Sequence, residues 1–187
     1  MRWMCDHPEL IAGRTVVDVG CGNGLGAIAA LRLGAEHAVA NDIDHLALAA
    51  AAVNAALNGV RVDWEKEAGG TGGAAGLGPR LTLSSANLLE DDVAARFRPE
   101  GGLVVLLGDM LYDDEIAAAA LAFGRRHLGT SSEGGAAVMF GDPGRQGRRL
   151  LRAGEAEEVV RMPLPAETCI ENYGMTEARA FRLLKAG

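Results

Sequence analysis

The feature that most constrains the fold of this chain is an apolar run that ends in a glycine-rich turn. Residues 15–19 (TVVDV) have the composition of a buried parallel strand, and Gly20, Gly22 and Gly24 follow at alternate positions. Glycine adopts positive φ angles readily and lets the backbone approach a ligand that a β-carbon would keep away. The pattern therefore predicts a strand, a turn and a helix with a ligand site at the turn.

An acidic residue in this strand, Asp18, narrows the kind of ligand. Its carboxylate would repel a pyrophosphate, whereas S-adenosylmethionine carries an ammonium and a sulfonium group that it would attract. We therefore expect Asp18, Gly20, Gly22 and Gly24 to bind S-adenosylmethionine.

Two alternatives stay open at the glycine turn. Residues 22–27 also fit the dinucleotide pattern G-x-G-x-x-A, with Asp42 about 20 residues further on, as in nicotinamide-dependent dehydrogenases. The other possibility is that Asp18 only caps a helix or a turn. The motifs downstream have to decide between these readings.

Composition limits the class of protein. The chain of 187 residues suits one domain, and its formal net charge of −7 argues against a non-specific grip on nucleic acid. Three widely spaced cysteines form neither a disulfide framework nor a zinc pattern, which favours a reducing, intracellular compartment. The histidines (His7, His37, His45 and His127) lack metal-site spacing and are expected at the surface or as caps, so we predict no metal. No apolar run is long enough for a membrane span.

Strands and helices alternate along most of the chain, which predicts a doubly wound, mainly parallel α/β sheet of Rossmann-like type. The C-terminal part differs, because two strand-like runs there fit an antiparallel hairpin at the edge of the sheet. Strands are expected at 15–19, 38–41, 81–84, 103–107, 136–140, 157–162 and 177–184, and helices at 27–33, 46–57 and 114–127. Residues 65–80 are rich in glycine and poor in apolar side chains, so we interpret them as a disordered insertion.

Ligands of open parallel sheets bind beyond the carboxyl ends of the strands, so the polar residues that follow each strand are site candidates. Asp42 is placed to accept hydrogen bonds from ribose hydroxyls, with a helix N-cap as its alternative role. Asn87 is placed to pair with an adenine edge, although a simple turn fits it equally well. Asp109 and Tyr112 follow the fourth strand at the expected reaction centre, and residues 141–145 (GDPGR) have the composition of a turn.

Taken together, these residues resemble the seven-strand S-adenosylmethionine-dependent methyltransferases, in the subgroup of protein lysine methyltransferases marked by D-x-x-Y. Within it they look most similar to the enzymes acting on the beta subunit of the electron transfer flavoprotein. The resemblance covers nearly the whole chain except the glycine-rich insertion. It rests on 18–22 (DVGCG), 40–44 (ANDID), 108–113 (GDMLYD), 141–145 (GDPGR) and 167–176 (ETCIENYGMT).

The resemblance implies one methyltransferase domain over residues 1–187 that transfers a methyl group to a protein lysine. It implies that Asp109 and Tyr112 are catalytic and that Asp142, Arg145 and Asn172 bind the substrate. The acceptor would be the flavoprotein beta subunit, with another protein of ribosomal type or a small amine as alternatives. Residues 2–8 (RWMCDHP) resemble the end of a helix that another cofactor-covering segment precedes in the family, so we expect that segment to be missing.

This departure leaves two further expectations open. One is a non-catalytic cofactor-binding module, because the cover over the cofactor would be incomplete. The other concerns location, which is the cytoplasm, or the mitochondrial matrix if a targeting leader is missing from this chain. From the acidic net charge and the lack of a long apolar run we expect no nucleic-acid or membrane partner, and the oligomeric state stays undefined.

The predicted chemistry requires a neutral amine. A lysine has a reference pKa of about 10.4, and a lone carboxylate such as Asp109 favours its charged form. We therefore expect Asp109 to orient the amine by a hydrogen bond rather than to deprotonate it, while burial near Tyr112 and release of the proton to water free the lone pair. The Tyr112 ring also offers its face to the cationic centre.

Overall fold

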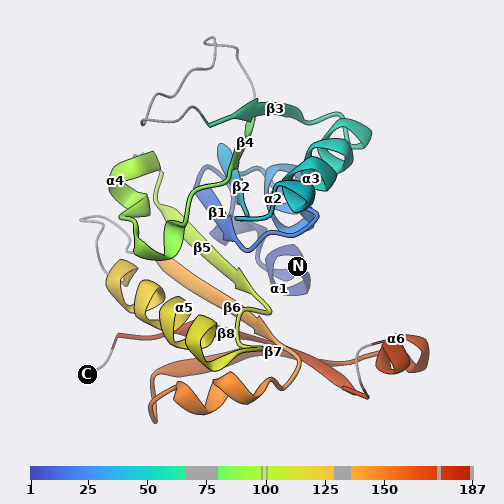
Figure 1. Cartoon of the computed structure of the whole chain (residues 1–187), viewed down its shortest axis with the longest axis vertical. Coiled ribbons are helices and arrows are strands. Elements are labelled where there is room, and N and C mark those ends of the chain that lie inside the picture. Colours follow the sequence, from blue (N-terminus) through green and yellow to red (C-terminus); the bar gives the residue numbers. More distant parts are fainter. Residues whose placement is uncertain (66–79, 98, 100, 129–135, 172–173, 186–187) are drawn as a thin grey trace.

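The computed structural model describes residues 1–65, 80–97, 99, 101–128, 136–171 and 174–185, and these residues form an eight-stranded sheet flanked by helices (Figure 1). The strands are β1 Thr15–Val19, β2 His37–Asn41, β3 Arg61–Trp64, β4 Arg80–Ser84, β5 Leu103–Gly108, β6 Ala137–Asp142, β7 Ala156–Pro163 and β8 Glu177–Leu183. The helices are α1 Arg2–Asp6, α2 Leu25–Arg32, α3 His45–Leu57, α4 Val93–Phe97, α5 Asp114–His127 and α6 Ala166–Glu171. Short 3-10 turns lie at η1 Pro8–Leu10, η2 Leu88–Glu90 and η3 Gln146–Leu150.

The strand order is β3-β4-β2-β1-β5-β6-β8-β7, with β8 running antiparallel to both of its neighbours. The order turns back at β1, which pairs in parallel with β2 on one side and with β5 on the other. Such a reversal opens a crevice at the carboxyl ends of the strands, where ligands of this architecture bind. The predicted fold class, including the antiparallel C-terminal hairpin, is confirmed.

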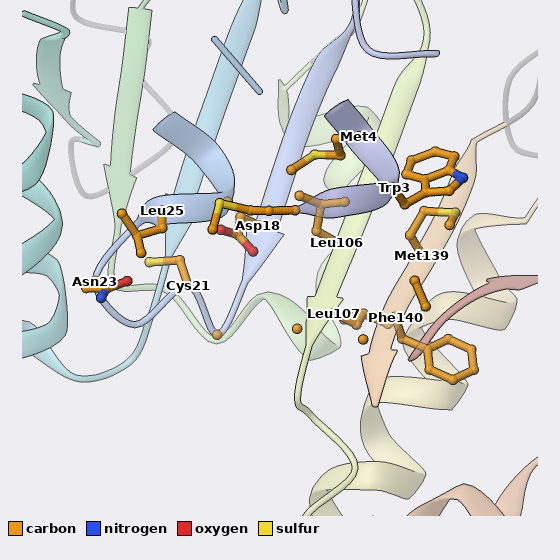
Figure 2. Close-up of a pocket in the computed structure, with 16 residues that line it drawn as sticks. Trp3, Met4, Asp18, Cys21, Asn23, Leu25, Leu106, Leu107, Met139 and Phe140 are labelled. Carbon is orange, nitrogen blue, oxygen red and sulfur yellow. The ribbon is translucent and has the colours of Figure 1, made fainter. Parts of the chain in front are cut away.

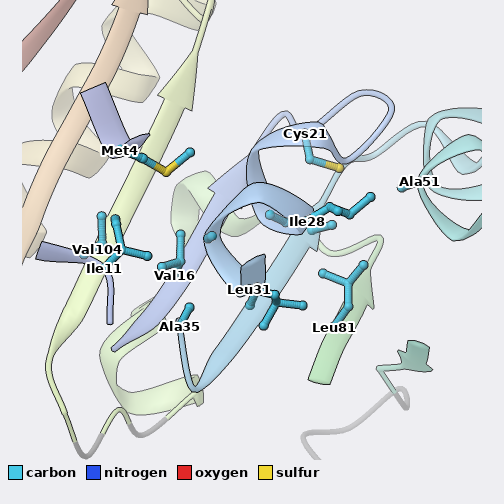
Figure 3. Close-up of a cluster of buried hydrophobic side chains, with 14 of the residues drawn as sticks. Met4, Ile11, Val16, Cys21, Ile28, Leu31, Ala35, Ala51, Leu81 and Val104 are labelled. Atoms are coloured by element: carbon cyan, nitrogen blue, oxygen red, sulfur yellow. The ribbon is translucent and has the colours of Figure 1, made fainter. Parts of the chain in front are cut away.

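Alternate residues of the central strand face two separate hydrophobic cores. Val16 packs with residues of α1, α2 and α3 on one face of the sheet (Figure 3). Val17 and Val19 pack with residues of α4 and α5 on the other. Helices therefore cover both faces, which is why β1 is buried at all five positions.

Three elements escaped the sequence analysis. One is α6, a short helix between the two strands of the C-terminal hairpin, and the other two are β3 and α4. Strand β3 is short, half exposed and mixed in composition, and it joins the sheet only as an edge partner of β4. Helix α4 covers barely more than one turn. Neither has the apolar periodicity on which sequence prediction depends.

The expectation that all four histidines are surface or capping residues is wrong for His37. This side chain is buried in β2, its Nε2 lies 2.8 Å from Thr82 Oγ1, and burial lowers its pKa to about 4. His127 is also buried, and its Nε2 accepts a hydrogen bond from Val93 N at the start of α4, which is a capping role. A buried cap has no sequence signature, because its partner is 34 residues away.

The predicted insertion at 65–80 lies mostly outside the described residues. Its two described ends belong to the sheet, since Glu65 N donates to Leu83 O and Arg80 begins β4. In the part of the chain that the structure describes, no helix is both long and apolar enough to cross a bilayer.

Candidate active site

Three adjoining cavities lie at the carboxyl end of the sheet and share Gly108 at the end of β5. We name them after one wall residue each: the Asp18 cavity of about 270 Å³, the Asp42 cavity of about 320 Å³ and the Asp142 cavity of about 360 Å³. Asp109 lines both the Asp42 and the Asp142 cavity. The predicted reaction centre is therefore the place where the cavities meet.

The Asp18 cavity lies between the glycine turn and α1 (Figure 2). Asp18 Oδ2 accepts a hydrogen bond of 3.1 Å from Ala27 N in the first turn of α2. A β-carbon at Gly26 would lie 2.5 Å from the same oxygen, so only glycine leaves room for this carboxylate. Asp18 thus both holds the start of α2 and forms a wall of the cavity, which combines the two roles that the sequence left open.

Burial gives the Asp18 cavity unusual electrostatics. Removal from water raises the pKa of the Asp18 carboxyl to about 7, against a partly opposing hydrogen bond from Ala27. Burial, with the nearby carboxylates of Asp18 and Asp42, raises the pKa of the Cys21 thiol to about 12. A cationic ligand group in this cavity would favour the ionised form of Asp18.

The three glycines of the turn have different tasks. All have positive φ: +68° at Gly20, +53° at Gly22 and +76° at Gly24. Of the three, only Gly20 lines the cavities, and a β-carbon there would lie 2.5 Å from Met110 Sδ. Gly22 and Gly24 instead shape the turn.

Trp3 of α1 is a further wall residue of the Asp18 cavity, and the sequence did not identify this role.

The Asp42 cavity carries the second predicted carboxylate. Asp42 Oδ2 accepts from Gly22 N at 2.9 Å and Asp42 Oδ1 accepts from Asp44 N at 3.0 Å. The N-cap of α3 is Asp44, whose carboxylate accepts from Leu46 N, so the alternative role proposed for Asp42 belongs to its neighbour. Each Asp42 oxygen retains a lone pair for a further donor.

Asn87 and Tyr112 also line the Asp42 cavity. The sequence predicted Asn87 beside the cofactor and Tyr112 at the reaction centre. Asn87 is exposed and makes a weak contact of 3.4 Å with Glu90. Tyr112 is 52% exposed at the rim. The sequence missed Asn41, whose buried Nδ2 donates to Ser84 O and Ala86 O and so fixes the loop that carries Asn87.

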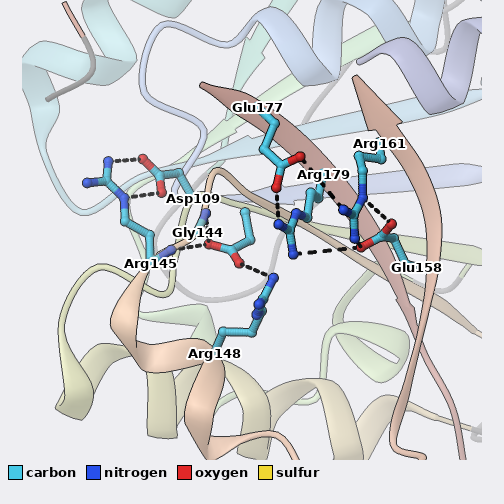
Figure 4. Close-up of polar contacts among 9 residues, drawn as sticks. Asp109, Gly144, Arg145, Arg148, Glu158, Arg161, Glu177 and Arg179 are labelled. Carbon is cyan, nitrogen blue, oxygen red and sulfur yellow. Dashed lines mark hydrogen bonds and ion pairs between the residues drawn. The ribbon is translucent and has the colours of Figure 1, made fainter. Parts of the chain in front are cut away.

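Asp109 is held by an arginine (Figure 4). Arg145 Nε donates to Asp109 Oδ1 at 2.8 Å and Arg145 Nη2 donates to Asp109 Oδ2 at 2.7 Å. Asp109 has a φ of +50°, the only positive value at a non-glycine residue among the described residues. Such a backbone is uncommon outside glycine, although aspartate adopts it more readily than most residues, and residues of this kind cluster at functional sites. The structure thus brings together two residues to which the sequence gave separate roles.

Asp142 shapes the turn that delivers Arg145. Its Oδ1 accepts from Gly144 N at 2.9 Å and from Arg145 N at 2.6 Å, and its side chain is fully buried. Asp142 Oδ2 has no hydrogen-bond donor among the described residues, and Arg148 Nη1 lies 3.7 Å away. Asp142 lines the third cavity, so a substrate role stays a prediction. Asn172, the remaining predicted substrate residue, lies outside the described residues.

Comparisons with known proteins agree with this geometry. A family model described as ribosomal protein L11 methyltransferase (PrmA) matches residues 7–71. The electron transfer flavoprotein beta subunit lysine methyltransferase of Danio rerio is 32% identical over 184 residues, which is 97% of this chain and 60% of that protein. The chain thus spans about 60% of the length of the curated relatives it matches.

Solved structures show the same fold. A putative RNA methyltransferase from Pyrococcus horikoshii is 14% identical with a TM-score of 0.62, covering 100% of this chain and 82% of that one. The magnesium protoporphyrin IX methyltransferase of Synechocystis with bound SAM is 15% identical with a TM-score of 0.59, covering 99% of this chain and 76% of that one. The chain therefore has the class I, seven-strand methyltransferase fold and is a relative, over nearly all of its own length, of the electron transfer flavoprotein beta subunit lysine methyltransferases.

Proposed function

We propose that this protein is an S-adenosylmethionine-dependent protein-lysine N-methyltransferase, and that its acceptor is the beta subunit of the electron transfer flavoprotein. The observation that carries the proposal is the junction at Gly108 and Asp109, where two cavities with cofactor-type walls meet a third one that opens along β7 and β8. A donor and an acceptor held on either side of this junction are the two reactants that methyl transfer must align.

The residues of the first two cavities fit S-adenosylmethionine. The buried Asp18 carboxylate suits its ammonium group, the lone pairs of Asp42 suit its ribose hydroxyls, and the exposed amide of Asn87 suits its adenine. The backbone at Gly20 leaves the approach free of a β-carbon. When bound, this group supplies a methyl carbon that is electrophilic because it is attached to a sulfonium.

The Asp142 cavity suits a lysine side chain. Its walls include Trp3, Val160 and Met162, which are apolar surfaces for the methylene chain. Asp109 at its inner end offers a carboxylate acceptor for the ε-amine N–H. This arrangement holds the amine in a fixed orientation, which is the main contribution that a methyltransferase can make.

The similarity to curated relatives supports the choice of acceptor. Six of them, from fish to nematode, carry the name of the flavoprotein beta subunit lysine methyltransferase or its homologue. The mitochondrial matrix is the location that this relationship suggests. A ribosomal protein is the second candidate acceptor, because 60 residues of this chain are 57% identical to part of the ribosomal protein L11 methyltransferase of Pseudomonas aeruginosa.

The test is transfer of a radiolabelled methyl group from S-adenosylmethionine to recombinant electron transfer flavoprotein, with Asp109→Asn as the comparison. We expect label on the beta subunit that is lost in the variant. Label on a ribosomal protein or another extract component instead would keep the reaction and replace the acceptor. Absence of label from every fraction, together with retained S-adenosylhomocysteine binding, would favour a non-catalytic binding module.

A further inference from the structure

The ion pair at the reaction centre bears on how the acceptor amine loses its proton. A lysine ammonium has a pKa of about 10.4 in water, and a lone carboxylate beside it stabilises the charged form, which has no lone pair for attack. Asp109 is not a lone carboxylate, because both of its oxygens accept from the Arg145 guanidinium. The protein itself thus supplies the counter-charge of this carboxylate.

We propose that Arg145 is a positioning residue that neutralises Asp109, so that the site receives lysine as the neutral amine rather than as the ammonium. This inference rests on the proposed function. The guanidinium repels an ammonium placed at Asp109, while each carboxylate oxygen keeps a lone pair for an amine N–H. Bulk water takes the proton, the freed lone pair forms the bond to the methyl carbon, and the electrons of the broken bond stay on sulfur.

The position of Arg145 is well determined by its surroundings. Its backbone N–H is fixed by Asp142 Oδ1, and the planar fork of its side chain matches the two oxygens of Asp109. The Arg145 side chain is 23% exposed and the Asp109 side chain 48%, so the charges of this pair are only partly screened by water. The turn of residues 141–145, anchored by the buried Asp142, therefore places an arginine beside Asp109.

The charged side chains that share the Asp142 cavity with Asp109 already have partners of opposite sign. Arg2, Asp142 and Arg179 line the same cavity as Asp109. Their partners are Asp6 for Arg2, Arg148 for Asp142 and Glu177 for Arg179. Tyr112 and Asp42 line the Asp42 cavity together with Asp109, and Asp42 is held by backbone N–H groups rather than by a cation. Loss of Arg145 would therefore leave Asp109 without its guanidinium and add a second uncompensated carboxylate to this site.

The test compares Arg145→Gln, which removes the charge, with Arg145→Lys, which keeps it. The first readout needs no catalysis: binding of n-butylammonium, a mimic of the lysine side chain, to protein saturated with S-adenosylhomocysteine at pH 7. We expect Arg145→Gln to bind this cation about threefold to tenfold more tightly than the wild type, because Asp109 is no longer neutralised. We expect Arg145→Lys to bind it as the wild type does.

The second readout is the pH profile of kcat/KM for the protein acceptor. In Arg145→Gln it should move up by about one pH unit and turnover at pH 7 should fall about tenfold, with recovery at higher pH. Arg145→Lys should keep the wild-type profile. A damaged site would weaken both cation binding and turnover. Tighter cation binding together with slower turnover in Arg145→Gln therefore distinguishes loss of the charge from structural damage.

Arg161→Gln is the matched control. Arg161 makes the same kind of two-point contact with Glu158, at 2.7 and 2.9 Å, and does not line any of the three cavities. It should leave both readouts unchanged. Equal or weaker cation binding in Arg145→Gln, an unmoved pH profile, or an Arg145→Lys profile like that of Arg145→Gln would each overturn the inference. If the wild type methylated no protein, the proposed function would be refuted. The butylammonium-binding measurement would still test whether Arg145 neutralises Asp109.

Discussion

The two halves of the site hold their carboxylates in opposite ways. Around the glycine turn, backbone N–H groups hold the side chains, with Ala27 N donating to Asp18 and Gly22 N donating to Asp42. In the C-terminal half a guanidinium lies beside each carboxylate: Arg145 holds Asp109, and Arg148 Nη1 is 3.7 Å from Asp142, whose other oxygen accepts from backbone N–H groups. Beyond the cavities, Arg125 holds Glu155 in the same way. Backbone donors bring no positive charge to a carboxylate, whereas a guanidinium does.

This difference suits the two ligands proposed for the site. A methyl donor that binds as a cation gains from uncompensated carboxylates, whereas an acceptor that must react as a neutral amine does not. The carboxylates of the first half therefore lack a cationic partner within the protein, whereas those of the second half have one. Changes to single carboxylates should accordingly affect donor binding in one half and turnover in the other.

The largest effect is expected at Asp109. Asp109→Asn should lower the rate of methyl transfer by about 100-fold or more, because the amide cannot orient the amine as the carboxylate does. Affinity for S-adenosylhomocysteine, measured by calorimetry, should stay within about twofold, since this change leaves the carboxylates of the donor cavities in place. Asp114→Asn is the matched control, because Asp114 is also held by one arginine, Arg149, but lies outside the cavities. If Asp109→Asn lowered the affinity for S-adenosylhomocysteine as much as the rate of methyl transfer, the proposed distinction between the two halves would be wrong.

Asp42→Ala should show the reverse pattern. Loss of the charged acceptor for ribose should weaken S-adenosylhomocysteine binding by about tenfold or more, while kcat at saturating donor changes little. Asp44→Ala is the neighbouring control: it removes the N-cap of α3 and should lower the free energy of unfolding by about 1 kcal/mol without changing affinity. An unchanged affinity in Asp42→Ala would remove this residue from the donor site.

Sequence reasoning captured the first half of the site better than the second. Asp18 and the glycines all lie within residues 18–24, and their type and spacing predict a turn at the end of a strand. The pair of Asp109 with Arg145 joins residues 36 positions apart, so it depends on β5 lying beside β6 in the sheet. Local pattern predicted the elements, but only the fold shows which charges meet.

The elements that were missed have the same cause. Strand β3 exists because β4 offers it an edge, and His127 is buried because it caps a helix from another part of the chain. Both depend on tertiary partners rather than on periodicity. By contrast, the strands at the centre of the sheet carry long apolar runs, and the structure contains each of them close to its expected bounds.

A smaller, pH-dependent effect is expected at Asp18. Because its carboxyl has a pKa of about 7 in the ligand-free protein against 3.8 unfolded, the folded state binds the extra proton between these values. Stability should therefore fall as pH rises from about 4 to 7, by about 4 kcal/mol at the most, and then level off. Thermal unfolding at pH 5 and 7.5 measures this, and Asp18→Asn should remove the difference.

The same group should make donor binding depend on pH in the opposite direction. A bound ammonium favours ionised Asp18, so affinity for S-adenosylhomocysteine should rise about tenfold from pH 5.5 to 7. Asp18→Asn, more stable than the wild type at pH 7.5, should bind weakly at every pH. A wild-type affinity that stays flat over this range would show that Asp18 does not receive the ammonium.

The smallest effect on the site is expected from Glu155, a carboxylate of the C-terminal half that lies away from all three cavities. Its side chain is 4% exposed, it accepts from Arg125 of α5 and from Arg152 N, and its backbone oxygen accepts from Leu184 N. The hydrogen bond from Arg125 is the main reason that the pKa of Glu155 falls to about 2.

Because this folded-state pKa is below the unfolded value of 4.5, the stabilisation is complete above pH 4.5 and is lost as pH falls toward 2. Glu155→Gln should lower the free energy of unfolding at pH 7 by about 1–3 kcal/mol, as expected for hydrogen bonds to a charged group, and should leave donor affinity and kcat unchanged. Urea unfolding of the wild type and of Glu155→Gln measures this: the two proteins should differ in stability at pH 7 and become similar at pH 3. Altered turnover in Glu155→Gln would mean that the arginine pairs of this half act together on the reaction centre, and that neutralisation is not confined to Asp109.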